Sequence, residues 1–125
     1  MKVSDLMNAP ETIDEKESVV SVARKMSKNQ IGSLIVVKNN KIVGIVTESD
    51  ILKNINKLSE KVSSVMSRSV IVVESNETLD EAARLMTKNK IKRLPVINSG
   101  KLVGIITATD ILANSDELNE DFFFS

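Results

Sequence analysis

The sequence contains no cysteine and no histidine, and these absences exclude several kinds of functional site. Without cysteine, the chain cannot form a disulfide or a zinc–thiolate site, which suits a reducing compartment. A catalytic centre would have to be built from Asp, Glu, Lys, Ser or Thr. The sequence brings together no such group that helix capping and solvation do not already explain. We therefore expect that the chain is not an enzyme and holds no metal through its own residues.

Tryptophan and tyrosine are also absent, and the only phenylalanines stand together at Phe122–Phe124. The hydrophobic core must therefore be aliphatic, and no buried ring is available to stack on a base. Seventeen basic and seventeen acidic residues cancel, so the chain lacks the positive surface that binds nucleic acid or an anionic membrane. No apolar run approaches the length of a membrane span, and the N-terminus lacks the apolar region of a signal peptide. We expect a soluble, cytoplasmic protein that binds neither nucleic acid nor a membrane.

An internal duplication organises most of the chain. Residues 18–52 align with residues 78–112, and sixteen of the thirty-five aligned positions are identical. The lead VSDLM at 3–7 resembles VSSVM at 62–66, with the offset reduced by one residue. We divide the chain into repeat 1 (residues 1–60), repeat 2 (residues 61–115) and an acidic and aromatic tail (residues 116–125).

Each repeat predicts the same order of helices and strands. Apolar residues recur at helical spacing after a capping Ser18 or Thr78. Two β-branched runs follow, joined by the two-residue turns Asn39-Asn40 and Ser99-Gly100, which favour tight hairpins. Short extended pieces at 12–13 and 70–73 precede the helices, and a second helix begins after each hairpin. Each copy therefore reads β-α-β-β-α.

This order predicts a mixed α/β (α+β) fold. The first strand and the strand after the helix should be parallel through a right-handed crossover, and the hairpin adds an antiparallel strand. A three-stranded sheet with helices on one face cannot cover its other face alone. We therefore expect the two repeats to pack sheet to sheet with pseudo-two-fold symmetry.

The repeated TESD and TATD, at residues 47–50 and 107–110, allow two interpretations. The first is a capping box, in which the threonine side chain caps the second helix. The aspartate at the third helical position accepts a hydrogen bond from the threonine amide in return. In the second, the same aspartate also accepts hydrogen bonds from the two hydroxyls of a ribose, because a carboxylate has about four acceptor sites. The residues alone leave both interpretations open.

The two copies resemble the paired CBS domains, named after cystathionine β-synthase, whose tandem is called a Bateman module. The resemblance covers residues 1–115 and rests on the VSDLM lead, the capped helix, RLPVI and the twofold ending VGIVTESDIL and VGIITATDIL. It implies a regulatory module that binds AMP, ADP, ATP or S-adenosylmethionine in clefts between the repeats. No cofactor is required, and Mg²⁺ carried by a nucleotide is the only metal expected. The resemblance also implies a homodimer formed through helices. We expect that a signal passes either to an effector protein or through a shift in the assembly of the module itself.

The same resemblance assigns roles to individual residues. The aspartates would hold ribose hydroxyls, the threonines would lie near ribose and phosphate, and aliphatic residues would line the adenine, although these are equally explained as core. The residues are Asp50 and Asp110, Thr47 and Thr107, and Thr12, Ile13, Val72, Val73, Leu94 and Pro95.

The two copies differ where a phosphate would lie. Repeat 2 has Lys92 and Arg93 where repeat 1 has Gly32 and Ser33, and Lys88 and Lys90 add positive charge nearby, although loop lysines are often only solvated. Repeat 1 instead adds Glu48 at the position of Ala108. We predict that the cleft with Asp110 and Arg93 binds a phosphorylated adenosine ligand more tightly than the cleft with Asp50.

The alternative function is a scaffold that dimerises or holds a protein partner with both clefts empty. The second helices carry the apolar residues Ile51, Leu52 and Ile55 in repeat 1, and Ile111 and Leu112 in repeat 2, which a single module would leave partly uncovered. The tail adds the hypothesis that Phe122–Phe124 pack on a neighbouring subunit, a partner or the module itself, because three exposed phenylalanines are unfavourable in water.

Overall fold

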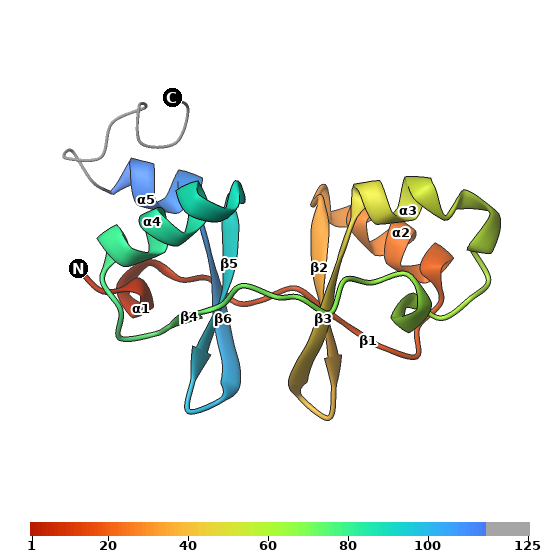
Figure 1. Ribbon diagram of the computed structural model, residues 1–125, viewed down its shortest axis with the longest axis horizontal. Coiled ribbons are helices and arrows are strands. Elements are labelled where there is room, and N and C mark those ends of the chain that lie inside the picture. The colour runs from red at the N-terminus through yellow and green to blue at the C-terminus, as the bar shows by residue number, and fades with distance from the viewer. Residues whose placement is uncertain (115–125) are drawn as a thin grey trace. The chain divides into compact units, whose positions relative to one another are not determined.

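The computed structural model describes residues 1–114, and these fold into two compact units (Figure 1). Unit 1 combines Met1–Pro10 with the chain from Ile71 onward, and unit 2 is Glu11–Val70. Each unit contains one three-stranded sheet. The acidic and aromatic tail, with Phe122–Phe124, lies outside the described residues. Within residues 1–114, no helix has both the length and the apolar character needed to cross a membrane.

Unit 2 has the predicted β-α-β-β-α order. Its elements are β1 (Thr12–Asp14), α2 (Val19–Asn29), β2 (Ser33–Lys38), β3 (Lys41–Thr47) and α3 (Glu48–Lys53), followed by two short 3₁₀ helices, η1 (Ile55–Lys57) and η2 (Val62–Ser64). Strand β1 is parallel to β2, and β3 is antiparallel to β2.

Unit 1 repeats this order and adds a short helix from the N-terminus. Its elements are α1 (Val3–Leu6), β4 (Val73–Glu74), α4 (Leu79–Asn89), β5 (Arg93–Asn98), β6 (Lys101–Thr107) and α5 (Ala108–Ala113). Strand β4 is parallel to β5, and β6 is antiparallel to β5. The mixed α/β class is confirmed, and the sheet-to-sheet packing of the repeats stays a prediction.

Strand β4 is shorter than the extended piece predicted at 70–73. In unit 2, the Ile35 amide donates to the Glu11 carbonyl, 3.3 Å away, and extends the pairing at the start of β1. The corresponding residue in unit 1 is Pro95, which has no amide hydrogen to donate. Regular pairing therefore begins only at Val73, opposite Val96.

The predicted caps and turns are confirmed. The side chain of Ser18 accepts a hydrogen bond from the Ser21 amide at 3.1 Å, and Thr78 caps α4 in the same way. Both hairpins turn through residues of positive φ, at Asn39-Asn40 and at Ser99-Gly100, as tight hairpins require.

The core of each unit lies between its sheet and its two longer helices. Figure 1 shows these helices on one face of each sheet. The core of unit 2 consists of Ile13, Val19, Val22, Met26, Leu34, Val36, Val46, Ile51 and Val62, and Ile35 is buried outside this cluster. The core of unit 1 consists of Val3, Val73, Leu79, Ala82, Ala83, Met86, Leu94, Val96, Ile106, Ala108 and Ile111.

The expectation that Ile51 and Ile111 form uncovered apolar faces is wrong. Their side chains are only 8% and 0% exposed because they fill the core beneath the second helix of each unit. Leu52 and Ile55 do remain exposed, at 71% and 60%. The uncovered apolar surface of unit 2 is therefore limited to the outer side of α3 and the start of η1.

The two lead segments are exchanged between the sequence repeats. Val3, at the start of the chain, is completely buried in unit 1, which otherwise comes from repeat 2. Its amide donates to the Glu77 carbonyl at 2.9 Å, and Asn8 pairs with Ile105 of β6 through two backbone hydrogen bonds. In Figure 1 the red helix α1 accordingly lies with the green and blue elements of unit 1.

The lead segment of repeat 2 packs in unit 2, which otherwise comes from repeat 1. Val62 is completely buried in unit 2, and its amide donates to the Glu17 carbonyl at 2.7 Å. Ser67 pairs with Ile45 of β3, as Asn8 pairs with Ile105. The compact units therefore divide the chain at 10/11 and 70/71, whereas the sequence repeats were drawn at 1–60 and 61–115.

Glycine permits both of these close approaches. A Cβ at Gly104 would lie 2.7 Å from the Met7 sulfur, and a Cβ at Gly44 would lie 2.7 Å from the Ser67 carbonyl oxygen. Such distances are too short for a side chain without displacement of the lead segment. The glycine in each VGI motif therefore serves the docking of a lead segment.

We predict that Val3→Ala destabilises unit 1 although Val3 belongs to repeat 1. Loss of two completely buried methyl groups should lower the free energy of unfolding by about 2 kcal/mol. Native-state hydrogen exchange should become faster in β5 and β6, and the matched variant Val62→Ala should accelerate exchange in β2 and β3. Acceleration in β2 and β3 by Val3→Ala would contradict the exchanged packing.

Candidate functional site

Each predicted threonine–aspartate pair lies where a hairpin strand ends and a helix begins. Thr107 is the last residue of β6 and caps α5, and the carboxylate of Asp110 accepts a hydrogen bond from the Thr107 amide. The N–O distance is 3.0 Å, and the Asp110 amide returns a hydrogen bond to the Thr107 hydroxyl at 3.1 Å. Thr47 and Asp50 form the same pair of bonds, at 2.9 and 3.2 Å. The capping interpretation is therefore confirmed in both units.

Capping does not use the whole of either carboxylate. In both boxes the aspartate accepts the capping hydrogen bond through Oδ2, and Oδ1 takes no part in the box. Both aspartates are half-buried, which leaves part of each side chain accessible. The geometry is thus compatible with the second interpretation, in which the same carboxylate also receives hydroxyl groups of a ligand.

Asp110 has a further partner that the sequence did not predict. The side-chain amide of Asn8 donates to Asp110 Oδ2 at 3.0 Å, across 102 positions of the chain. The corresponding residue of unit 2 is Ser67, whose backbone pairs with Ile45 as that of Asn8 pairs with Ile105. The similar leads indicated that Asn8 and Ser67 correspond, but nothing in the sequence indicated that Asn8 would reach Asp110.

The predicted residues of unit 1 divide between the two faces of its sheet. Leu94 pairs with Ile106 and lies in the core beneath the helices, as does Val73 of β4. Arg93 pairs with Thr107, and because side chains alternate along a strand, both lie on the opposite face. Pro95 shares that face with Arg93 and is buried, and Val72 is half-buried just before β4.

The predicted residues of unit 2 show the same division. Ile13 is 8% exposed and belongs to the core under the helices. Thr12 precedes it on β1, is half-buried, and accepts a hydrogen bond from Lys25 Nζ through its carbonyl. Ser33 stands opposite Thr47, at the place that Arg93 occupies in unit 1. The structure thus supports Leu94, Val73 and Ile13 as core residues, and leaves the other face to Thr12, Val72, Pro95 and Arg93.

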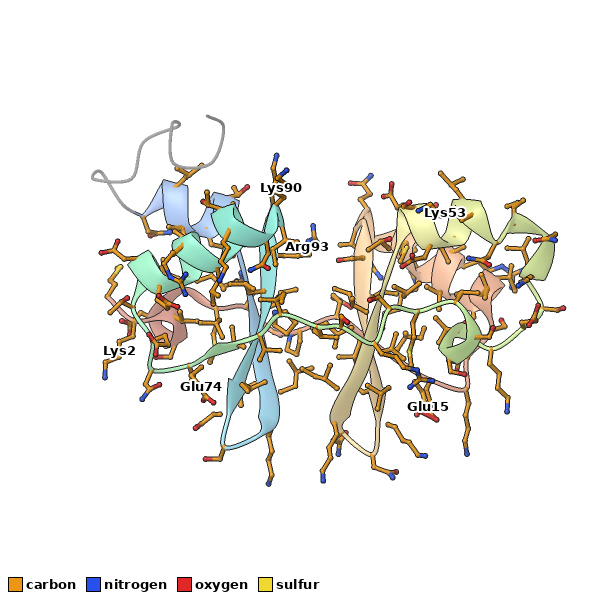
Figure 2. All side chains as sticks on the ribbon, viewed as in Figure 1. Lys2, Glu15, Lys53, Glu74, Lys90 and Arg93 are labelled. Atoms are coloured by element: carbon orange, nitrogen blue, oxygen red, sulfur yellow. The ribbon has the colours of Figure 1, made fainter. Side chains whose placement is uncertain are left out.

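The charge around the two junctions differs as predicted. Figure 2 shows Lys90 and Arg93 together, where α4 ends and β5 begins, and the exposed Lys92 lies between them in the chain. In unit 2, the Glu48 carboxylate lies 3.3 Å from where a Cβ on Gly32 would stand. The corresponding side chain of unit 1 is the buried Ala108. Unit 1 therefore places cations beside its junction, and unit 2 places an anion.

A groove of about 330 Å³ lies in unit 2 between α2 and α3. Its lining is mostly apolar: Ala23, Met26, Ser27, Gln30, Ile31, Glu48, Ile51 and Leu52. Thr47 and Asp50 do not line the groove, but Glu48, which lies between them in the chain, does. Within residues 1–114, no group of three or more acidic residues could hold a metal ion.

The hydrogen bond from Arg84 lowers the pKa of Glu81 on the exposed surface of α4, where the two side chains are 2.7 Å apart. Because the folded pKa lies below the unfolded one, the pair contributes stability above the ordinary carboxyl pKa and loses it as the pH falls. Because both side chains are accessible to water, solvent screening makes the contribution of this pair small.

Two small α/β units, each containing a capped Thr-x-x-Asp junction, define a tandem module. The model of the CBS domain matches residues 3–57 and 62–117, and the chain therefore belongs to the CBS-domain family. The resemblance found in the sequence is confirmed.

Several known proteins are similar over most of the chain. The uncharacterized protein MJ1426 of Methanocaldococcus jannaschii is 34% identical, over 90% of this chain and 89% of its own length. Inosine-5′-monophosphate dehydrogenase of Thermoplasma acidophilum is 45% identical over 77% of this chain. The matched part is only 20% of that enzyme, so the similarity concerns its CBS region.

Solved structures of CBS pairs have the same fold. The structure of CBSX2 in complex with AMP has a TM-score of 0.81 at 28% identity and covers 90% of this chain and 93% of that one. The CBS domain pair of MJ0100, in complex with 5′-methylthioadenosine and S-adenosyl-L-methionine, has a TM-score of 0.78 at 30% identity, with coverage of 90% and 98%. These two CBS-domain proteins therefore bind adenosine-containing ligands.

We predict that Thr47→Val and Thr107→Val each lower the free energy of unfolding by about 1 kcal/mol, because each removes one capping hydroxyl without a large change in volume. Denaturant unfolding measures this difference. Thr109→Ala is the matched control, since Thr109 lies in α5 and is exposed but is not part of the capping box. Equal stability of Thr107→Val and the wild type would show that the capping hydroxyl contributes nothing.

Proposed function

We propose that this chain is a regulatory module that binds adenosine-containing ligands at its two threonine–aspartate junctions. The observation that carries the proposal is that Asp50 and Asp110 complete their capping boxes through Oδ2, so that Oδ1 takes no part in the box. The bound AMP, 5′-methylthioadenosine and S-adenosylmethionine of related CBS pairs support this ligand class. The Oδ1 atoms would receive ribose hydroxyls, in charge-assisted hydrogen bonds.

The charges beside each junction favour different ligands. Arg93 stands opposite Thr107, and its guanidinium can bind a phosphate through two parallel hydrogen bonds. Lys90 and Lys92 add positive charge, so we propose a phosphorylated ligand, AMP, ADP or ATP, at Asp110, with any Mg²⁺ carried by the nucleotide. Beside Asp50, the Glu48 carboxylate disfavours phosphate. An adenosine ligand without phosphate, such as S-adenosylmethionine, suits that junction better.

The adenine is proposed to lie against aliphatic side chains outside the helix-covered cores. Val72 and Pro95 fit this role for the Asp110 junction, and Thr12 for the Asp50 junction, since they lie off the helix-covered face or at its edge. Ile13, Val73 and Leu94 would act from behind, by holding these strands in place. We propose no catalytic activity for the chain. Ligand binding would instead act on an effector protein or change the assembly of the module itself.

We predict that Asp110→Ala reduces the affinity for AMP more than Asp50→Ala does. Loss of charge-assisted hydrogen bonds to the ribose should weaken binding at Asp110 at least tenfold. Isothermal titration calorimetry of the wild type and both variants gives affinity and stoichiometry. Arg93→Ser gives unit 1 the serine that unit 2 has at the corresponding position. This variant should have a lower affinity for AMP but an unchanged affinity for adenosine.

The outcomes separate the proposal from its rivals. If Asp110→Ala loses stability as a cap variant does but keeps its affinity for AMP, the aspartate is only a cap. Equal losses of AMP affinity in Asp50→Ala and Asp110→Ala would contradict the proposed difference between the two junctions. Hydrolysis of a nucleotide by the purified chain would overturn the regulatory assignment.

The alternative function is a scaffold that works with empty binding sites. The exposed Leu52 and Ile55 favour it, because they continue the apolar lining of the groove between α2 and α3 onto the surface. We propose that these residues contribute to a homodimer formed through helices. A thermal shift on addition of AMP separates a sensor from a scaffold, since only a ligand that binds the folded state raises the melting temperature.

We predict that Leu52→Lys shifts the chain from dimer to monomer, because a charge would be buried in an apolar contact. Sedimentation velocity at several protein concentrations measures the shift. Val103→Lys is the matched control, since Val103 is an exposed apolar residue of β6, in the other unit. A Leu52→Lys variant that still sediments as a dimer would contradict the proposed interface.

A further inference from the structure

The hydrogen bond between Asn8 and Asp110 connects the proposed binding residue to the first ten residues of the chain. Asn8 is held in place by its backbone, which donates to and accepts from Ile105 at 2.8 and 2.9 Å. Its side-chain Nδ2 then reaches Asp110 Oδ2 at 3.0 Å. The backbone pairing does not depend on the side chain, so the contact with Asp110 can be removed without undocking the segment.

The contact changes which acceptor sites Asp110 can offer. Oδ2 receives two N–H groups, from Thr107 and from Asn8, at 3.0 Å each. A carboxylate oxygen has about two lone-pair sites, so Oδ2 is fully used. Asp50 Oδ2 receives a capping hydrogen bond from Thr47, and Ser67, at the position of Asn8, has a side chain too short to imitate an amide.

We propose that Asn8 is a positioning residue for ligand binding at Asp110. With the Asp110 carboxylate held by two donors on Oδ2, its rotation is restricted and Oδ1 is presented as the single acceptor for ribose hydroxyls. This inference rests on the proposed function and adds a residue from outside repeat 2 to the site. Asn8 acts through Asp110, so its effect should be confined to ligands that have ribose hydroxyls.

The proposal implies a link between ligand binding and docking of the N-terminal segment. A ribose bound to Asp110 Oδ1 favours the carboxylate orientation that Asn8 also stabilises. By linkage, AMP should therefore stabilise the paired state of Asn8 and Ile105. Slower hydrogen exchange at the Asn8 and Ile105 amides in the presence of AMP is expected, without a similar change at Ser67 and Ile45.

The test compares two ligands in two proteins. AMP and 2′,3′-dideoxyadenosine monophosphate differ only in the hydroxyls that Asp110 would receive. The measurements are made in an Asp50→Ala background, which leaves one intact junction. Calorimetry should then show that Asn8→Ala lowers the affinity for AMP about three- to tenfold, the range that the loss of one hydrogen bond implies. The affinity for the dideoxy nucleotide should not change. Asn8→Asp, which replaces the donor by a second carboxylate, should weaken AMP at least as much.

Ser67→Ala, measured in the same background, is the matched control, because Ser67 holds the equivalent backbone position in unit 2. It should leave both affinities unchanged. Equal losses for the two nucleotides in Asn8→Ala would mean that Asn8 acts on the fold, and no loss for AMP would mean that Asp110 needs no positioning. Either result overturns the role of Asn8 while AMP binding stands. If the wild type and the Asp50→Ala variant bind neither nucleotide, the proposed function fails first, and the positioning role fails with it.

Discussion

The backbone pairing of each lead segment with a hairpin strand is the constraint on which the rest of the structure depends. Asn8 pairs with Ile105, and Ser67 pairs with Ile45, in both cases beside a glycine that leaves room for the contact. These pairings bring a buried valine into each core. They also deliver Asn8 to Asp110. Core packing and the chemistry of the candidate site are therefore consequences of the same docking.

The capping boxes show how one set of atoms can serve both stability and recognition. Helix α5 begins after Thr107 because the Thr107 hydroxyl accepts from the Asp110 amide in the first turn, and the Asp110 carboxylate accepts from the Thr107 amide at the end of β6. This use fixes the aspartate without consuming both of its oxygens. The two units keep the box and differ in its surroundings, with Arg93 beside one junction and Glu48 near the other. The two copies therefore share the capping box and differ in the charged side chains beside it.

Local patterns were sufficient to predict most of the fold. Helical spacing after Ser18 and Thr78 predicted α2 and α4, and the turn residues predicted both hairpins, because these signals act between near neighbours. The exchange of leads could not be predicted, since VSDLM and VSSVM are alike and fit either core. For the same reason Asn8 was missed as a partner of Asp110. Ile51 and Ile111 were assigned to a surface because helical spacing on a short segment does not say which side the sheet will cover.

The exchange of leads also sets an order of events as the protein is made. Unit 2 is one continuous stretch, Glu11–Val70, which is complete as soon as that stretch has emerged from the ribosome. Unit 1 needs Val3 and Asn8, which are synthesised before unit 2, together with β6, which is synthesised after it. The N-terminal residues must therefore wait, undocked, while about a hundred residues are added. Their pairing closes a loop of about a hundred residues, which is a slow entropic step. The residue that positions Asp110 thus reaches its place only after Ile105 of β6 has been added to the chain.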